Sequence, residues 1–209
     1  MRIIKPSIEI LTPIDDATVM KHIEMCGRVC YKSEGKITDT SADSFIAGII
    51  KRGHEAVVEH YNITVKFICD RGVSHEIVRH RLASYCQEST RYCNYSKDDF
   101  GKEITVIKPC FMEPGTVSWD FWKEACEVAE SSYFDLLEFG CTPQEARTVL
   151  PNSLKTEVVM TANVREWRHF LKLRTAPAAH PQMREVADMV LVEFQRMMPI
   201  LFGDIKPEV

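Results

Sequence analysis

The 209-residue chain lacks any cysteine pair spaced as Cys-x-x-Cys, although it contains eight cysteines. Such pairs are typical of zinc ribbons and of thioredoxin-like redox sites, so neither class is supported. We also expect no secretion signal, because charge and proline interrupt the first residues at Arg2, Lys5 and Pro6. We therefore expect reduced thiols and a cytoplasmic location.

Long hydrophobic runs and an excess of positive charge are absent as well. No apolar run approaches the length of a membrane span. The 26 basic and 30 acidic side chains leave a net charge of −4, so no overall field attracts nucleic acid. Without an internal repeat, a low-complexity tract or a linker, the chain is expected to form a single domain over residues 1–209. We expect it to bind neither nucleic acid nor a membrane.

The spacing of apolar residues predicts a mixed α/β (α+β) fold. The clearest strand covers residues 61–69, where Ile63, Val65 and Phe67 alternate with polar neighbours. We expect a central, mostly antiparallel sheet with helices packed around it. Further strands are predicted over residues 3–10, 103–108 and 157–162, and helices over residues 13–30, 40–52, 73–82, 118–139, 143–150, 163–173 and 181–198.

Capping residues set the expected boundaries of these helices. Thr12 before a proline and Ser118 are predicted N-caps. Thr142 with Glu145 forms a capping-box pattern, and Asn163 opens a second pattern of this kind. Gly53 is expected to follow the C-terminus of the second helix.

Residues 79–92 have a composition that no hydrophobic core needs. They contain three arginines, a histidine, two serines, a threonine and two tyrosines. The planar fork of an arginine matches phosphates and other flat anions in a way that lysine cannot. A surface helix end with salt bridges would explain a lone Arg-His-Arg, but the additional polar residues favour an anion site. In a helix, Arg79 and Arg81 would point about 200° apart and contact different groups.

The histidines do not suggest a metal centre. His75-Glu76 begins like a zinc-protease motif, but Arg79 stands where the second histidine should be. A cation there would oppose a metal ion, so we predict no metal. His54 and His60, taken alone, are more often structural histidines.

A second group of polar residues lies further along the chain. Arg165 and His169 are four residues apart and share a helical face. Asn163 is already explained as an N-cap, and Arg174 as a cation at a helix end. Arg147 fits a solvated helix face and a phosphate or pyrimidine contact equally well.

Two stretches together resemble the flavin-dependent thymidylate synthases. Arg79-His80-Arg81, followed after seven residues by Ser89 and then by Arg91-Tyr92, is similar to the signature of this family. Residues 163–174, Asn-Val-Arg-Glu-Trp-Arg-His-Phe-Leu-Lys-Leu-Arg, resemble its second block, and Gly53-His54-Glu55 resembles its flavin-side loop. The match spans about residues 50–195.

The sequence also departs from the family pattern. Cys86 and Gln87 stand where many members have Asn-Glu, and an amide replaces a carboxylate there. The stretch between Arg174 and Pro181 is longer than usual.

The resemblance implies reductive methylation of dUMP to dTMP. Methylenetetrahydrofolate would donate the carbon, NADPH would be the reductant and FAD the hydride carrier, in a homotetramer with shared active sites. Arg174 would be the catalytic residue and would stabilise negative charge on the uracil ring. No cysteine nucleophile is required, so Cys86 should be dispensable. Implied FAD contacts are His54, Arg79, His80, Arg81, Gln87, Asn163, Val164, Arg165 and His169. Implied dUMP contacts are Glu76, Ile77, Val78, Arg79, Gln87, Glu88, Ser89, Thr90, Arg91, Arg147 and Arg174.

Two other classes of protein remain as alternatives. A nucleotide- or RNA-binding module would use the arginine cluster without catalysis, but the acidic net charge and the lack of a lysine-rich stripe disfavour it. A metal-dependent hydrolase would use the histidines, and their spacing disfavours it.

Overall fold

The computed structural model describes residues 1–206. Two compact units are present. No helix in the described part of the chain is long and apolar enough to cross a bilayer. The first unit comprises Met1–Ser7, Phe67–Arg79 and Tyr85–Val159, and the second comprises Ile8–Lys66, His80–Ser84 and Met160–Val209.

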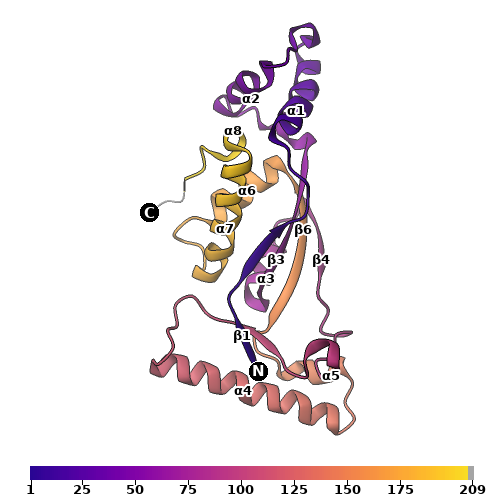
Figure 1. The fold of residues 1–209 in the computed structure, drawn as a ribbon, viewed down its shortest axis with the longest axis vertical. Coiled ribbons are helices and arrows are strands. Elements are labelled where there is room, and N and C mark those ends of the chain that lie inside the picture. Colours follow the sequence, from indigo (N-terminus) through magenta and orange to yellow (C-terminus); the bar gives the residue numbers. More distant parts are fainter. Residues whose placement is uncertain (207–209) are drawn as a thin grey trace. The chain divides into compact units, whose positions relative to one another are not determined.

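A four-stranded antiparallel sheet has the strand order β2-β3-β6-β4 (Figure 1). In β3, Ile63, Val65, Phe67 and Cys69 are buried and their neighbours on the other face are less so, which confirms the predicted strand. The mixed α/β fold with its antiparallel sheet is likewise confirmed. The strands are β2 (Ser7–Ile10), β3 (Asn62–Asp70), β4 (Ala83–Gln87) and β6 (Lys155–Asn163).

The first unit is built around a core of mixed aromatic and aliphatic residues. β1 (Arg2–Ile4) pairs in parallel with β5 (Thr105–Ile107). The long helix α4 (Val117–Glu138) buries Cys126 and Tyr133, seven residues apart on one face. The remaining helical segments are α3 (Arg71–Ile77), the 3-10 turn Asp98–Phe100, α5 (Pro143–Ala146) and the 3-10 turn Arg147–Val149.

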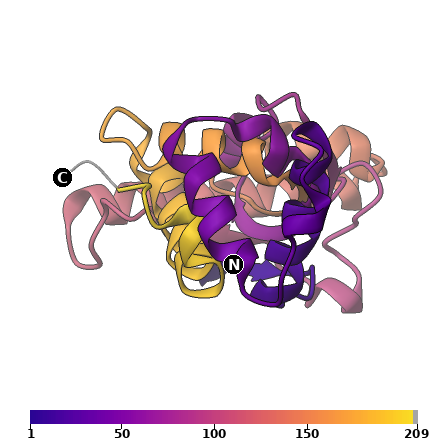
Figure 2. The same cartoon turned by 90° about the horizontal axis from the view of Figure 1, so that it is seen from above.

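The second unit is mostly helical. α1 (Asp16–Cys30) packs against α2 (Ser41–Lys51), and α6 (Val164–Arg174) packs against α7 (Pro181–Met197) (Figure 2). Trp167 meets Phe170 and Phe194 edge to face, each at 5.4 Å between ring centroids. The shorter segments are the 3-10 turns Glu34–Lys36 and Glu55–His60 and the helix α8 (Pro199–Phe202).

Several predicted helix ends are confirmed. Gly53 follows α2 with a φ of 69°, a conformation that glycine adopts without strain. The Thr142–Glu145 capping box opens α5. Asn163 caps α6, and its side chain accepts a hydrogen bond from the backbone amide of Glu166 at 2.9 Å.

Two predicted caps are wrong by a few residues. Asp15, not Thr12, caps α1 and accepts from the backbone amide of Thr18 at 3.1 Å. The Thr12 hydroxyl instead accepts from the Thr64 amide at 2.8 Å. At α4 the cap is Thr116, which accepts from Trp119, and not Ser118.

The helix predicted over residues 73–82 is shifted. Asp70 caps it by accepting from the Val73 amide at 2.8 Å, so α3 begins at Arg71 and ends at Ile77. Arg79, His80 and Arg81 therefore lie in the connection to β4, a strand that was not predicted. The half-buried face of β4 includes the polar Gln87 and the exposed face includes Cys86, so its sequence lacks a clear apolar alternation. The strand predicted over residues 3–10 is divided at Lys5–Pro6, since proline cannot donate a ladder hydrogen bond.

Candidate functional site

The predicted site residues separate between the two units. Every predicted dUMP contact except Arg174 lies in the first unit. Every predicted FAD contact except Arg79 and Gln87 lies in the second unit. Each group is therefore described within its own unit.

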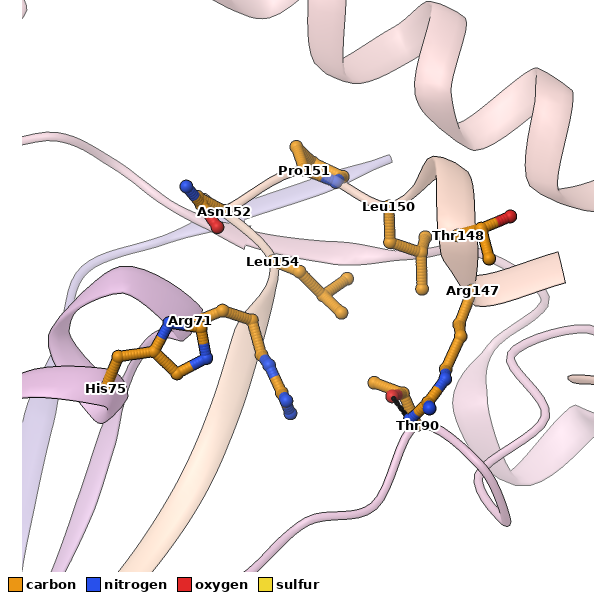
Figure 3. Close-up of a pocket in the computed structure, with 9 residues that line it drawn as sticks. All are labelled: Arg71, His75, Thr90, Arg147, Thr148, Leu150, Pro151, Asn152 and Leu154. Carbon is orange, nitrogen blue, oxygen red and sulfur yellow. Dashed lines mark hydrogen bonds between the residues drawn. The ribbon is translucent and has the colours of Figure 1, made fainter. Parts of the chain in front are cut away.

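A hollow of about 340 Å³ in the first unit is lined by two arginines (Figure 3). Arg147 Nη1 donates to the hydroxyl of Thr90 at 3.2 Å. Arg71 Nη1 lies 3.4 Å from the backbone carbonyl of Glu88, a long hydrogen bond. Both guanidinium groups thus hold the loop that contains residues 88–90. The other lining residues are His75, Thr148, Leu150, Pro151, Asn152 and Leu154.

Arg71 lines this hollow but is not among the residues predicted from the sequence. It occupies the first position of α3, directly after the cap Asp70. A cation is unfavourable at a helix N-terminus because of the helix dipole. An arginine at this unfavourable position is the sequence feature that could have indicated a functional role, since a residue that opposes local preference often has another role.

The loop after β4 forms a tight turn rich in donors. The amides of Tyr92 and Cys93 donate to the carbonyl of Ser89, at 3.1 and 2.9 Å. The Arg91 amide points to the Ser89 hydroxyl at 3.3 Å. The exposed guanidinium of Arg91 lies over the Tyr92 ring, 5.5 Å from its centroid. Together with the hollow, this turn gathers the hydroxyl and guanidinium groups that a phosphate needs.

The side chains of Gln87 and Glu88 are engaged within the first unit. Gln87 Nε2 donates to the hydroxyls of Ser74 at 2.9 Å and Thr156 at 3.3 Å. The Glu88 carboxylate accepts from Tyr95 at 3.1 Å and from Lys155 at 2.9 Å. Burial, together with this carboxylate, raises the pKa of Tyr95. The contact between Glu88 and Arg71 is made through the Glu88 main-chain carbonyl.

The other predicted dUMP contacts on and after α3 differ in exposure. Ile77 is fully buried, and its carbonyl accepts from the Tyr85 hydroxyl at 3.0 Å. Glu76 is half-buried, and Val78 and Arg79 are exposed.

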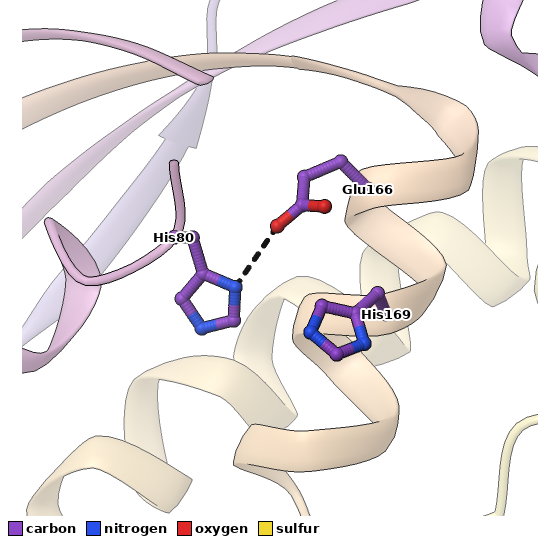
Figure 4. A group of neighbouring side chains, drawn as sticks. All are labelled: His80, Glu166 and His169. Carbon is purple, nitrogen blue, oxygen red and sulfur yellow. Dashed lines mark hydrogen bonds and ion pairs between the residues drawn. The ribbon is translucent and has the colours of Figure 1, made fainter. Parts of the chain in front are cut away.

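In the second unit, His80 lies within a buried polar cluster (Figure 4). Its Nδ1 is 3.0 Å from Oε1 of Glu166, and its Nε2 accepts from Nε of Arg174 at 3.1 Å. The His169 ring lies 5.6 Å from the His80 ring and is exposed. Burial lowers the pKa of His80 and Arg174 adds to this, whereas the hydrogen bond to Glu166 opposes it. The Nε–H of Arg174 can only donate, so His80 Nε2 carries no proton in this arrangement.

The remaining predicted FAD contacts surround the N-terminus of α6 or lie at the surface. Val164 is buried, and Asn163 caps the helix. Arg165 is exposed and pairs with Glu59 at 2.5 Å. The remaining two are exposed: Arg81, and His54, whose Nδ1 is 3.4 Å from the Tyr31 hydroxyl.

His80, Glu166 and His169 also have the spacing of a metal site. Their ligand atoms lie within 4.8 Å of one another. A metal ion would have to replace a hydrogen bond of His80, and the Arg174 guanidinium would place a positive charge beside it. Hydrogen bonding therefore explains this cluster better than metal ligation.

Comparison with known proteins identifies similar chains. A family model described as "Thymidylate synthase complementing protein" matches residues 14–200. The flavin-dependent thymidylate synthase of Geobacter sulfurreducens is 31% identical over 208 residues, covering 94% of this chain and 84% of the relative. That of Pyrococcus furiosus is 30% identical over 196 residues, covering 93% and 78%. The solved structure of the UMP/dUMP methylase PolB from Streptomyces cacaoi, bound with 5-Br dUMP, has the same fold. Its TM-score is 0.77 at 23% identity, over 97% of this chain and 96% of that one.

Proposed function

This chain belongs to the family of flavin-dependent thymidylate synthases, and we propose from that premise that it converts dUMP to dTMP with three particular partners. Methylenetetrahydrofolate donates the carbon, NADPH is the reductant and FAD is the hydride carrier. Flavin dependence and methylation of a nucleotide belong to the family, whereas the choice of these three molecules is our proposal.

The observation that best supports nucleotide binding is the arginine-lined hollow of the first unit. Arg71 and Arg147 converge on the loop that carries Ser89, Thr90 and Arg91. Two guanidinium forks and neighbouring hydroxyls are donors that proteins use for a phosphate monoester. We propose that they hold the phosphate of dUMP, together with the other predicted contacts on α3 and β4.

The donor set of the second unit fits a cofactor that carries a diphosphate. Arg81, Arg165 and His169 offer exposed donors, and Asn163 and Val164 place the N-terminus of α6 nearby in sequence. When bound, the flavin supplies the hydride chemistry that side chains lack. His54 and His80 complete the proposed set in the second unit, and the family resemblance adds Arg79 and Gln87 of the first unit.

Arg174 is the proposed catalytic residue. Its Nε is held by His80, which orients the guanidinium plane. We propose that its positive charge stabilises negative charge that develops on the uracil ring, which favours attack by the C5 carbon. Fixed donors of this kind act without reorganisation during the reaction.

The first test is the visible spectrum of the purified protein without oxygen. We expect a flavin band that bleaches when NADPH and dUMP are added. Methylenetetrahydrofolate should then yield dTMP. UMP in place of dUMP tests the preference for the deoxynucleotide. A colourless protein that also takes up no added FAD overturns the proposal and favours a binding module.

The organisation of the enzyme is also proposed. We propose one domain over residues 1–209, because the family match runs through both units. We also propose a homotetramer with shared active sites, supported by the sequence resemblance to the family. Light scattering should give the mass of four 24.0-kDa chains, and a monomer would contradict it. A cytoplasmic location stays a prediction.

A further inference from the structure

Glu166 has no role in the reaction scheme above, yet it is almost fully buried. Glu166 is only 6% exposed. Carboxylates are rarely buried without a partner. Glu166 is the third residue of α6, and its backbone amide donates to the cap Asn163. In a capping box its carboxylate would return to the cap. The carboxylate instead reaches His80, 86 residues away in the chain.

The two hydrogen bonds of His80 determine its tautomer. The Nε–H of Arg174 is only a donor, so His80 Nε2 must accept from it. A neutral imidazole with an accepting Nε2 carries its proton on Nδ1. Nδ1–H then donates to Glu166 Oε1 at 3.0 Å. All three residues belong to the second unit.

We propose that Glu166 is a positioning residue that holds His80 in the Nδ1–H tautomer and thereby fixes the direction of the Arg174 guanidinium. The inference rests on the proposed function in one respect, that Arg174 contacts the uracil ring of dUMP. Without Glu166, the other tautomer becomes accessible. It would bring the Nε2–H of His80 against the Nε–H of Arg174, and the two donors would repel each other.

Nitrogen-15 NMR of protein with labelled histidine tests the tautomer directly. The His80 signals are assigned as those that disappear in His80→Gln. In the unmodified enzyme these signals should show a protonated Nδ1 and an unprotonated Nε2. In Glu166→Ala this pattern should be lost. Glu166→Gln should retain part of it, because the amide oxygen can still accept from Nδ1–H. A protonated Nε2 in the unmodified enzyme overturns the proposal, even if no synthase activity is found.

Binding and kinetics test the consequence for Arg174. Glu166→Ala should lower kcat/KM for dUMP by about tenfold to a hundredfold, the range of one charge-assisted hydrogen bond, and Glu166→Gln should lie between. The matched control is Glu193→Gln, which removes an exposed carboxylate from α7 and should change nothing. Flavin content, measured on each variant, shows whether the cofactor site is intact.

A double-mutant cycle separates positioning from a general structural role. If Glu166 acts through Arg174, Glu166→Ala should not weaken dUMP binding further in an Arg174→Ala background. If the losses of dUMP binding in the two single variants add up in the double variant, the inference is overturned. An unchanged kcat/KM in Glu166→Ala also overturns it. In both cases the wild-type enzyme would still be active, so the proposed function would stand. Stoichiometric bound metal that disappears in Glu166→Ala also overturns it. A wild-type protein without flavin or dTMP formation refutes the proposed function instead.

Discussion

Arg147 and Thr90, 57 residues apart in the chain, are joined by a hydrogen bond of 3.2 Å from Nη1 to Oγ1. Thr90 is buried, whereas Arg147 is exposed. The hydroxyl therefore anchors one edge of the guanidinium and directs the arginine into the hollow of the first unit (Figure 3). This contact favours the functional reading of Arg147 over the solvated helix face, which the sequence left equally open.

Replacing Arg147 with lysine should weaken dUMP binding. Lysine keeps the charge but cannot bond Thr90 and a phosphate with one planar fork. Loss of a hydrogen bond to a charged group costs about 1.5–3 kcal/mol, so Kd for dUMP should rise about tenfold or more. Isothermal titration calorimetry measures the Kd for dUMP in each variant. Arg196→Lys, at an exposed ion pair on α7, is the control and should bind normally. Equal affinity of both variants would argue against a phosphate contact.

Cys86→Ala should leave dTMP formation unchanged. The thiol is exposed on β4, and the proposed reaction uses no cysteine nucleophile. The measurement is the initial rate of dTMP release, with flavin absorbance as the control for folding. If the variant kept its flavin but made no dTMP, the mechanism would be wrong for this protein.

Arg168→Ala should destabilise the second unit. Arg168 is 1% exposed and bonds Glu55 at 3.0 Å, Asp204 twice at 2.7 Å, and the carbonyl of Leu201. Removing one partner of a buried ion pair costs about 3–5 kcal/mol, because the other charges are left unpaired. Since Asp204 is partly exposed, we expect the lower end of this range.

Urea unfolding at a fixed protein concentration measures this loss. The comparison variant is Arg196→Ala, whose ion pair with Glu193 is exposed. It should cost no more than about 1 kcal/mol. Similar losses in the two variants would show that the buried network contributes little.

The stability should fall as the pH decreases below about 6.5, the ordinary histidine pKa. The pKa of His80 is lowered in the folded state, mainly by burial. On acidification the unfolded state therefore binds a proton before the folded state does, and the free energy of unfolding decreases. The decrease ends once the pH is below the folded-state pKa, where both states are protonated.

His80→Asn should have a smaller decrease over the same pH window. Unfolding curves of both proteins at a series of pH values provide the measurement. If both proteins lost stability equally, other groups would account for the pH dependence.

Local patterns in the sequence were sufficient for much of the fold. β3 follows from strict alternation of buried residues, and the start of α5 follows from Thr142 and Glu145. The α3 helix begins two residues before its predicted start at residue 73, because Asp70 caps it by accepting from the Val73 amide. Burial alternates along β4, but its inner face carries Ala83, Tyr85 and Gln87 and its outer face Ser84 and Cys86, so the sequence shows no apolar alternation that predicts a strand. These errors moved Arg79, His80 and Arg81 from a helix into a connection.

The sequence by itself determined the predicted strand β3 and the start of α5, and it predicts an anion site from the spacing of arginine, serine and threonine. It could not show which side chains meet. Arg71 joins Arg147 at one hollow, and Glu166 reaches His80, across many residues of chain. Only the tertiary structure decided these pairings, since hydrogen bonds form between neighbours in space. Local preference alone had assigned Glu166 to a helix cap.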